Sequence, residues 1–514
     1  MREGRSGHRP HRIRDNARSA GQARSERYRQ LTNPFTPLRV FSEEALEEMH
    51  RSALRILSEL GIRVLLEEAR RTFAAAGAIV DDAAQLVRIG PDIVAHALRQ
   101  VAHTTELTAL APERRVQVGG AHLAVIPVSG PPNVTDLVRG RRPGTLQDFC
   151  DLVRLAQAFD VVHMLGPSVE PQDVPTEFRH LDTTFAQLTL SDKTPYVFAR
   201  GTAQAQDCFA MIRLAHGLDE ATFRSRCYCW TNINTNSPRQ LDVPMAQGII
   251  DFARAGQLTI VTPFTLAGAM APITIPGALT LAHAEALAGI TLAQIVRPGA
   301  PVVYGGFTSN VDMKSGSPAF GTPEFVKACL GTGQLARHIG LPWRGSNATG
   351  SSVADEQATY ESAMSLWGAV LGGCNILVHG AGWLEGGLAA SFEKFILDVE
   401  MLQIMAEVLQ PVLVSADEIG LEAVAEVPPG GHFFSVPHTM QRYRDAFYSP
   451  LLSDWRNFGQ WSEDGAKRAS QRASETWQGV LREFVAPTRD PAVVEALRAF
   501  AARRRSEGGA RPLA

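Results

Sequence analysis

Between residues 121 and 410, short apolar runs alternate with longer stretches in which apolar residues recur at helical spacing. Strands that alternate with helices of ten or more residues indicate βαβ units and a parallel sheet. Eight apolar runs are each expected to form a strand: Leu123–Val128, Val161–Gly166, Tyr196–Arg200, Cys227–Asn232, Leu258–Phe264, Val302–Phe307, Pro342–Asn347 and Asn375–His379. The pattern predicts an α/β fold in which residues 121–410 form a (β/α)8 TIM barrel. An open doubly wound sheet is the alternative, and it is less favoured because no Gly-x-Gly-x-x-Gly follows any run.

The chain before the barrel predicts an N-terminal helical subdomain. Residues 1–35 are rich in arginine and poor in apolar side chains, which is typical of a disordered basic tail. In residues 36–120, Ser42 is a candidate N-cap, and the apolar residues after it recur at helical spacing: Leu46, Met49, Ala53, Leu57 and Leu60. Alternation over residues 106–118 predicts an antiparallel ribbon that closes the bottom of the barrel.

The chain after the barrel, residues 411–514, loses the strand–helix alternation. Residues 425–465 are rich in aromatic residues, Pro and Gly, and so many aromatic side chains rarely lie exposed to water. We therefore expect a loop-rich lid over part of the barrel, with Pro428–Pro450 at its rim. Residues 463–503 return to a polar amphipathic pattern and predict a helical extension.

Composition and charge exclude several classes of protein. The 514 residues are 45% hydrophobic and carry a net charge of −3, so no overall field attracts nucleic acid or an anionic membrane. The six cysteines are irregularly spaced, which favours a reducing, cytoplasmic setting over a disulfide-bonded secreted protein. No uninterrupted apolar run of about 18 residues is present, so no membrane-spanning segment is expected.

Motifs for metals and nucleophiles are scarce. Cys227 and Cys229 fall on one predicted strand with their thiols on the same side. A zinc site needs further cysteine or histidine ligands at defined spacing, and the neighbouring sequence supplies none. The chain also lacks a phosphate-binding Gly-x-x-x-x-Gly-Lys-Ser/Thr motif and a Gly-x-Ser-x-Gly nucleophile elbow. We therefore expect no metal, and kinase and nucleophilic hydrolase functions are disfavoured.

The last predicted strand places polar residues at the C-terminal end of the barrel, where barrel enzymes carry their active sites. It ends at His379, and the glycine-rich loop that follows presents Trp383 and Glu385. We expect His379 and Glu385 to be catalytic. The alternative is structural, with His379 as a hydrogen-bonded strand end and Trp383 as a packing residue.

Aromatic residues and two arginines also fall near strand ends. Several aromatic rings around one barrel mouth can form a cage that attracts a quaternary ammonium group through the negative faces of the rings. Arg200 and Arg344 are candidates for bidentate binding of a substrate carboxylate, or they pair with acidic neighbours such as Asp136 or Glu385. The expected substrate-binding residues are Phe307, Trp343, Arg344, Asn347, Trp383, Tyr304, Trp230 and Arg200.

Four segments resemble the trimethylamine methyltransferase family. They are Gly305–Glu324, Ala354–Ala358, His379–Gly387 and Gly430–Thr439, and the arginine-rich N-terminal tail is similar too. The resemblance covers nearly the whole chain. It implies a (β/α)8 barrel that moves a methyl group from a methylated amine to the cobalt of a separate corrinoid protein.

Two departures from the family pattern bear on the substrate. The archaeal trimethylamine enzymes carry pyrrolysine near the end of the seventh strand, whereas residues 347–352 of this chain are all standard amino acids. In addition, Gly380 follows His379 where many relatives have Asp, and Trp383 stands where Tyr is common. The absence of pyrrolysine shifts the substrate that the resemblance implies to a quaternary amine, as in the glycine betaine:corrinoid methyltransferases of the same family, and the second departure bears on which amine it is.

The chemistry of a quaternary amine suits this assignment. The leaving group of a quaternary amine is a neutral tertiary amine, so no special electrophile is required to activate it. The enzyme mainly has to orient the C–N bond toward cobalt in a mouth from which water is excluded. No Asp-x-His-x-x-Gly run for holding a corrinoid occurs in the chain, so the resemblance implies that a partner protein supplies the cofactor. We also expect a homo-oligomer. The alternatives are a barrel lyase or hydrolase that uses His379 and Glu385 as an acid–base pair, and a betaine-binding protein without turnover.

Overall fold

The computed structural model describes residues 30–198, 200–444 and 446–513. Most of the expected basic tail, residues 1–29, lies outside the described residues. The boundary expected at residue 35 is too late, because strand β1 (Leu31–Thr32) already pairs with β7 (His122–Val125) in antiparallel orientation. The chain is therefore fixed to the central sheet within a few residues of the first described one.

The N-terminal region forms helices and a small separate sheet. The helices are α2 (Glu43–Arg55), its π-helical continuation η1 (Ile56–Leu60), α3 (Glu67–Ala75) and α4 (Pro91–Leu98). The small sheet has the order β11-β2-β4-β3, with β2 (Ile62–Val64), β3 (Ile79–Asp81), β4 (Leu86–Arg88) and β11 (Gln240–Leu241). Ser42 caps α2 as expected, because its side chain accepts a hydrogen bond from the backbone N–H of Ala45. Leu60 is exposed, so the apolar face of this helix ends one turn earlier than expected.

The expected ribbon is present. Strands β5 (Thr105–Leu107) and β6 (Val116–Val118) pair in antiparallel orientation, flanking the short 3-10 turn η2 (Pro112–Arg114). Leu107, Val116 and Val118 pack into the apolar cluster inside the curled sheet, together with residues of β10 and β12. The ribbon thus closes the floor of the sheet.

The centre of the molecule is a curled parallel sheet. Its strands run in the order β7-β17-β16-β13-β12, and β10 pairs with β12 at the other edge. These strands are β7, β10 (Trp230–Thr235), β12 (Leu258–Ala267), β13 (Val302–Gly305), β16 (Trp343–Ser346) and β17 (Ile376–Val378). Beyond β13, β14 (Phe307–Val311) continues along β12 and pairs with β15 (Pro318–Ala319).

Two of the eight expected strands are reduced to single bridges. Met164 bridges to Thr194, and Tyr196 bridges to Trp230, both in parallel orientation. The backbone N–H of His163 donates to the carbonyl of Val125 at the end of β7. Segments 161–166 and 196–200 therefore lie between β7 and β10 without forming extended ladders, and β10 starts three residues later than the expected run.

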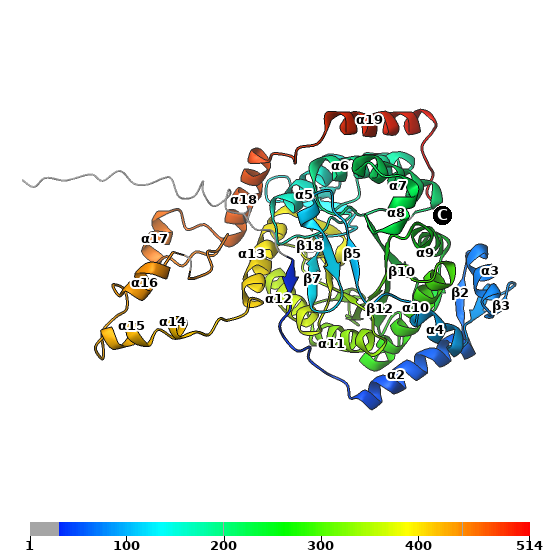
Figure 1. The fold of residues 1–514 in the computed structure, drawn as a ribbon, viewed down its shortest axis with the longest axis horizontal. Helices are drawn as coiled ribbons and strands as arrows, with labels where there is room; N and C mark the ends of the chain where they lie inside the picture. The colour runs from blue at the N-terminus through cyan, green and yellow to red at the C-terminus, as the bar shows by residue number, and fades with distance from the viewer. Residues whose placement is uncertain (1–29, 199, 445, 514) are drawn as a thin grey trace, which may run out of the picture.

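Helices surround the sheet (Figure 1). They are α5 (Leu146–Ala158), α6 (Thr176–Leu190), α7 (Thr202–His216), α8 (Glu220–Ser225), α9 (Val243–Ala255), α10 (Ile275–Val296), α11 (Pro323–His338), α12 (Glu356–Leu371) and α13 (Phe392–Val408). Many begin at a Ser, Thr or Asp whose side chain accepts a backbone N–H: Thr145, Asp219, Asp242, Thr274, Thr322, Asp355 and Ser391. Helix α10 is long and apolar enough to cross a membrane, yet 83% of its most apolar window is buried inside the protein, which identifies it as a core helix.

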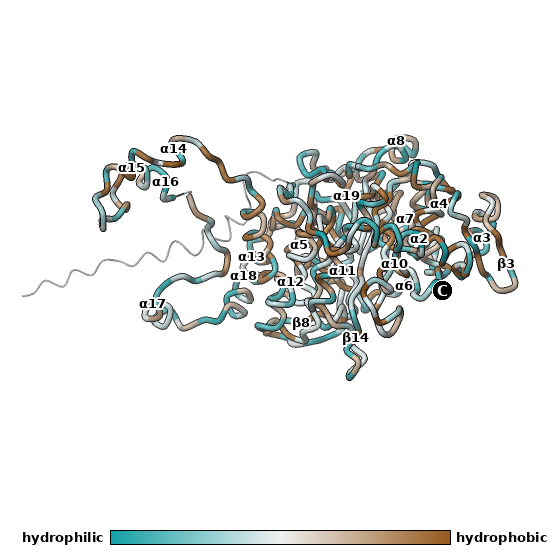
Figure 2. Tube along the Cα trace, turned by 90° about the horizontal axis from the view of Figure 1, so that it is seen from below, coloured by the Kyte–Doolittle hydropathy of each residue, from teal (hydrophilic) through white to brown (hydrophobic). Residues whose placement is uncertain are grey.

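The C-terminal segment does not form the expected lid. Residues 411–463, here called the arm, carry α14 (Ala416–Ile419), α15 (Leu421–Glu426), α16 (Pro437–Arg442) and α17 (Phe458–Glu463) and extend sideways from the body (Figures 1 and 2). The arm touches the body midway, where the carboxylate of Glu400 on α13 accepts backbone N–H groups of residues 451–453. The chain then returns as α18 (Ala469–Glu483), packed on α13, and α19 (Pro491–Ser506), packed on α6 and α7.

Candidate functional site

Five aromatic rings meet at the C-terminal end of the curled sheet, here called the mouth. They are contributed by β12, β14, the loop after β15, the end of β17 and β18 (Trp383–Leu384), and they are Phe264, Phe307, Phe320, His379 and Trp383. Phe307 lies at the centre, with ring centroids 5.1 Å from Phe264, 5.4 Å from Phe320, 5.4 Å from His379 and 6.0 Å from Trp383. This group of rings is called the aromatic cluster below.

His379 and Trp383 form the tightest contact of the aromatic cluster. Their ring centroids are 3.8 Å apart, and both side chains are buried. His379 has a φ of 61°, an uncommon conformation for a residue other than glycine, and such strain concentrates at functional sites. Gly387 lies under the indole, where an added Cβ would approach Trp383 Cη2 to 2.6 Å. Burial, assisted by the charge of Arg344, holds the pKa of His379 well below its usual range, so the imidazole is neutral at pH 7.

The loop that carries these two rings is supported from beneath by a buried ion pair. The backbone N–H of Gly382 donates to Asp398 on α13 at 2.8 Å. The other oxygen of Asp398 accepts from Lys394 and Ser362, and both members of the Asp398–Lys394 pair are fully buried. These hydrogen bonds fix the position of the Asp398 carboxylate. The carboxylate in turn fixes the backbone of the loop over the mouth.

Arg344 lies inside the curled sheet next to the aromatic cluster. Arg344 pairs in register with Gly305 of β13. A Cβ added at Gly305 would lie 2.1 Å from Thr262 Oγ1, so no residue larger than glycine fits at this position beside the arginine. Its guanidinium lies 5.1 Å from the ring centre of Phe307 and donates to the carbonyl of Gly306 at 3.3 Å. Among the described residues it forms no ion pair with a carboxylate. Burial lowers its pKa to about 9, so it still carries its charge at pH 7.

Buried polar atoms without hydrogen-bond partners gather at this place. Within the described part of the chain they include Arg344 Nε, Ser346 Oγ, Asn347 Oδ1, His379 Nδ1 and Trp383 Nε1. Most buried polar atoms in proteins are satisfied, and each exception needs an explanation. Five exceptions from β16, β17 and β18 around one aromatic cluster indicate a site shaped for a ligand with both polar and apolar parts.

Glu385 lies at the rim of the mouth and not against His379. Both of its carboxylate oxygens accept from Nε of Arg141, at 2.9 and 3.0 Å. Glu385 belongs to η3 (Glu385–Gly387), between β18 and β19 (Ala389–Ser391), and the latter pairs with β8 (Asn133–Thr135). The ion pair thus links two loops across the rim. Among the contacts of the described residues, none joins Glu385 to His379, and the acid–base role expected of the two stays a prediction.

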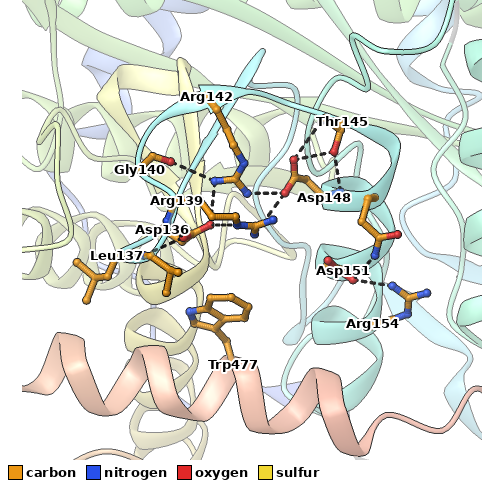
Figure 3. Close-up of polar contacts among 12 residues, drawn as sticks. Asp136, Leu137, Arg139, Gly140, Arg142, Thr145, Asp148, Asp151, Arg154 and Trp477 are labelled. Atoms are coloured by element: carbon orange, nitrogen blue, oxygen red, sulfur yellow. Dashed lines mark hydrogen bonds and ion pairs between the residues drawn. The ribbon is translucent and has the colours of Figure 1, made fainter.

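The loop that carries Arg141 is fixed by a buried network of charges between β8 and β9 (Arg142–Pro143). The guanidinium groups of Arg139 and Arg142 converge on the carboxylates of Asp136 and Asp148 (Figure 3). Burial opposes the charge of Asp136, but the backbone N–H and guanidinium of Arg139 and the guanidinium of Arg142 lower its pKa overall. Asp136 therefore pairs with these two arginines and not with Arg344 or Arg200, as one alternative had suggested.

Four of the expected substrate-binding residues lie away from the aromatic cluster. Tyr304 and Trp343 are register partners on the outer face of the sheet, where Tyr304 is hydrogen-bonded to His283 of α10 and the Trp343 indole donates to a carbonyl after α12. Trp230 points inward but lies at the floor, with its ring 4.8 Å from that of Tyr196. Arg200 pairs with Glu170, and its side chain is 45% exposed.

The outward positions of Tyr304 and Trp343 have one physical cause. Successive residues within a strand point to opposite faces of the sheet, so Trp343 and Arg344, both within β16, cannot both face the mouth. Arg344 faces inward, and the adjacent Trp343 must therefore face the surrounding helices. Of the expected residues, the structure brings together Phe307, Arg344, Asn347, His379 and Trp383.

Polar residues that the sequence did not single out also line the mouth. Thr262 donates to Asn232, which in turn donates to Asn234, and Asn234 is exposed. Their positions at the ends of β10 and β12 were a usable signal, since polar side chains at strand ends in barrels commonly face the site. Phe264 gave the same signal, because it ends the expected strand Leu258–Phe264, whereas Phe320 gave none, because an isolated phenylalanine is more often a core residue.

The described residues contain no group of three or more His, Cys, Asp or Glu placed to hold a metal ion. Cys227 and Cys229 are buried in different apolar clusters, one inside the sheet and one outside it. The expectation that the two thiols point to the same side of a strand is wrong, because β10 begins only at Trp230 and neither cysteine belongs to it.

Comparisons with known proteins identify the family of the chain. A sequence profile of the family described as trimethylamine methyltransferase (MTTB) matches residues 5–509. The chain belongs to the MTTB family. The chain is similar to a glycine betaine methyltransferase of Desulfitobacterium hafniense strain Y51, with 34% identity over 472 residues that cover 91% of this chain and 98% of the relative.

A second MTTB relative is the trimethylamine methyltransferase MttB of Desulfitobacterium hafniense strain DSM 10664 / DCB-2. It is 28% identical, over 86% of this chain and 89% of the relative. Among solved structures, the monomethylamine methyltransferase MtmB of Methanosarcina barkeri aligns with a TM-score of 0.45 and 12% identity, over 87% of this chain and 95% of that chain. As a member of the MTTB family, the chain is a methyltransferase that acts on methylated amines.

Proposed function

We propose that this methyltransferase takes a methyl group from a small quaternary amine that bears a carboxylate, glycine betaine being the leading candidate, and passes it to the Co(I) corrinoid of a separate protein. The observation that carries the choice of substrate is Arg344, a buried guanidinium without a carboxylate partner among the described residues. An uncompensated buried charge is costly, and a ligand carboxylate would compensate it. The name of the glycine betaine methyltransferase relative supports the same substrate class.

The aromatic cluster suits the other end of such a substrate. A quaternary ammonium group is attracted to the faces of aromatic rings, best to tryptophan. His379 is neutral because burial lowers its pKa, so it adds no positive charge that would repel the ammonium group. We therefore assign the carboxylate to Arg344, with Asn347 and Ser346 as further polar contacts, and the trimethylammonium group to the surface formed by Trp383, His379 and Phe307.

The proposed contribution of the chain to catalysis is positioning. When the partner is docked, its corrinoid supplies the nucleophile for the methyl group. The chain's own residues hold the amine, orient its C–N bond toward the mouth and keep water away from it. The aromatic rings must not bind the cationic substrate much more tightly than the transition state for methyl transfer. Only interactions that are stronger in the transition state than in the bound substrate accelerate the reaction.

We infer that the curled sheet closes into the full (β/α)8 barrel. Segments 161–166 and 196–200 lie between β7 and β10, and single parallel bridges join them to each other and to Trp230. The hydrogen bond from His163 to Val125 supplies the remaining connection. A closed barrel places the aromatic cluster at its C-terminal end, which is the face where barrel enzymes bind substrates.

The alternative of a barrel lyase or hydrolase has less support. Its acid–base pair would need Glu385 near His379, whereas Glu385 is engaged by Arg141 at the rim. A betaine-binding protein without turnover has the same site requirements as the enzyme, and only an assay separates the two.

The deciding experiment incubates the purified protein with free Co(I) cobalamin or a reduced corrinoid protein and one methylated amine at a time. Glycine betaine is expected to give the absorbance of the methylated corrinoid together with dimethylglycine, while choline and trimethylamine react slowly. Binding of glycine betaine without transfer to any corrinoid would favour the binding protein. Transfer from trimethylamine and not from glycine betaine would contradict the assignment of Arg344.

A further inference from the structure

The arm exposes an unusual concentration of large apolar side chains. Among the described residues, thirteen of the thirty exposed large apolar side chains lie between residues 412 and 458. Six of them are aromatic: Phe433, Phe434, Tyr443, Phe447, Trp455 and Phe458. A monomeric protein in water rarely exposes apolar patches of this size, so the arm needs a covering surface.

A second uncovered apolar surface lies on the barrel wall beside the base of the arm. Helices α12 and α13 pack against each other, and each carries an apolar stripe at positions i, i+4, i+7 and i+11 that is half-buried against the core in part and exposed in part. The stripes are Tyr360, Met364, Trp367 and Leu371 on α12, and Leu397, Met401, Ile404 and Val408 on α13. Tyr360, Met364, Ile404 and Val408 are between 41% and 59% exposed. The outer face of a barrel helix is ordinarily polar, so this spacing indicates a helix face built to be covered.

We propose that a second copy of this chain covers both surfaces. The arm of one protomer packs on the α12–α13 face of its partner, and a two-fold axis makes the partner's arm pack on the α12–α13 face of the first protomer. The two surfaces are adjacent on the same side of the body, as a two-fold exchange requires (Figure 1). Helix α18 packs on part of α13, yet Tyr360, Met364, Ile404 and Val408 stay exposed among the described residues.

The charges of the arm favour a second copy over a different partner. Residues 411–430 carry four acidic and no basic side chains, whereas residues 431–447 carry two arginines and one aspartate. Arg442 pairs with Asp417 and is close to α14, so the outgoing and returning halves form one hairpin. A two-fold axis reverses the direction of one hairpin relative to the other and places the acidic half of each near the basic half of its partner.

The size of the surface is adequate for a stable contact. Fully buried aromatic side chains cover about 150–250 Å² each, so the six aromatic residues of the arm alone supply several hundred Å² of the roughly 800 Å² that each partner contributes to a standard interface. The arm also leaves the mouth free, because it extends sideways and not across the C-terminal end of the sheet, marked by β14 in Figure 2. Dimerisation and access to the mouth are therefore compatible.

The test measures mass in solution by sedimentation equilibrium and multi-angle light scattering. The wild-type protein is expected at twice the chain mass of 55.7 kDa or a multiple of it. The arm variant Leu413→Asp/Phe434→Asp and the wall variant Met364→Asp/Ile404→Asp are each expected to shift to the single-chain mass. The matched control is Ile79→Asp, which changes an equally exposed apolar residue on β3, at the opposite side of the body. Unchanged circular dichroism spectra and melting curves establish that the variants are folded.

A second measurement identifies the contact itself. A photo-reactive side chain placed at position 434 is crosslinked in a mixture of ¹⁵N-labelled and unlabelled chains, and the products are mapped by mass spectrometry. The proposal predicts mixed-label crosslinks to residues 360–408. A wild-type protein that is monomeric at micromolar concentration, crosslinks confined to one chain, or arm variants that keep the wild-type mass would each overturn it. Loss of methyl transfer to a corrinoid protein with unchanged mass would assign the arm to that partner instead.

Discussion

The imidazole of His379 lies against the indole of Trp383, with ring centroids 3.8 Å apart and planes inclined by 37°. The contact joins a strained strand end to a glycine-rich loop, and a buried ion pair on α13 holds that loop in place. The guanidinium of Arg344 lies 5.1 Å from the ring centre of Phe307, so a cationic group that suits a carboxylate lies beside aromatic rings that suit an ammonium group. The predictions below separate these two contributions.

Replacing Trp383 by leucine removes the negative ring face but keeps apolar bulk. Binding of glycine betaine should weaken by roughly 0.5–2 kcal/mol, the range of cation–π contributions. Isothermal titration calorimetry measures the change, with 3,3-dimethylbutanoate as an isostere in which an uncharged tert-butyl group replaces the trimethylammonium group. An equal loss for the isostere would show that packing, and not the charge of the ammonium group, explains the effect.

The variant Arg344→Gln tests the carboxylate contact. It should weaken glycine betaine by roughly 2–5 kcal/mol, because a buried charged hydrogen bond is lost. Choline has no carboxylate, and its weaker binding should stay the same or improve as the positive charge is removed. Arg200→Gln is the matched control, since that arginine pairs with Glu170 away from the aromatic cluster. If both ligands lost equal affinity, Arg344 would have a structural role only.

Binding of a carboxylate should also depend on pH in a defined direction. Burial lowers the pKa of Arg344 to about 9, so the guanidinium is charged below that pH and becomes neutral above it. The affinity for glycine betaine is therefore expected to be constant between pH 7 and about 8 and to fall as the pH rises past about 9. Titrations across this range in wild type and Arg344→Gln check the prediction, and a parallel decline in the variant would refute it.

The ion pair beneath the site loop should contribute strongly to stability. The variant Asp398→Asn leaves Lys394 buried without its counter-charge, which typically costs about 3–5 kcal/mol. Urea denaturation measures the free energy of unfolding. Asp417→Asn is the control, because the ion pair of Asp417 with Arg442 is exposed on the carboxylate side and should contribute less than about 1 kcal/mol. Equal effects of the two substitutions would contradict the supporting role assigned to Asp398.

His216 should make stability fall with decreasing pH. Burial, with a smaller effect of the positive charge of Arg489, lowers the pKa of His216 to about 4, whereas the unfolded chain has the ordinary value of 6.5. The unfolded state therefore binds a proton first as the pH falls below 6.5, and stability is lost progressively down to about pH 4, by up to about 3 kcal/mol. The variant His216→Phe keeps the ring contact with Tyr228 and should lack this part of the pH dependence. Denaturation curves at several pH values compare the two proteins, and identical slopes would disprove the assignment.

Local features of this fold could be predicted because short-range physics decides them. Ser42 caps α2, Pro91 opens α4, and the run beginning at Leu258 is a strand, since capping, backbone restriction and β-branched composition act within a few residues. The sequence resemblance to the MTTB family likewise rested on short segments of the chain. Both inferences needed no knowledge of which elements lie side by side.

The tertiary structure alone decided which side chains face the mouth. Trp343 and Arg344 are neighbours in the chain, yet register turns one toward the helices and the other into the sheet. Phe320 and Asp398 join the site from distant positions, and the aromatic residues after residue 410 extend outward where a lid was expected. The sequence determines that side chains alternate between the two faces of a strand, but the pairing of distant strands determines which residues face inward. Whether an apolar surface is covered depends on the chain that packs against it.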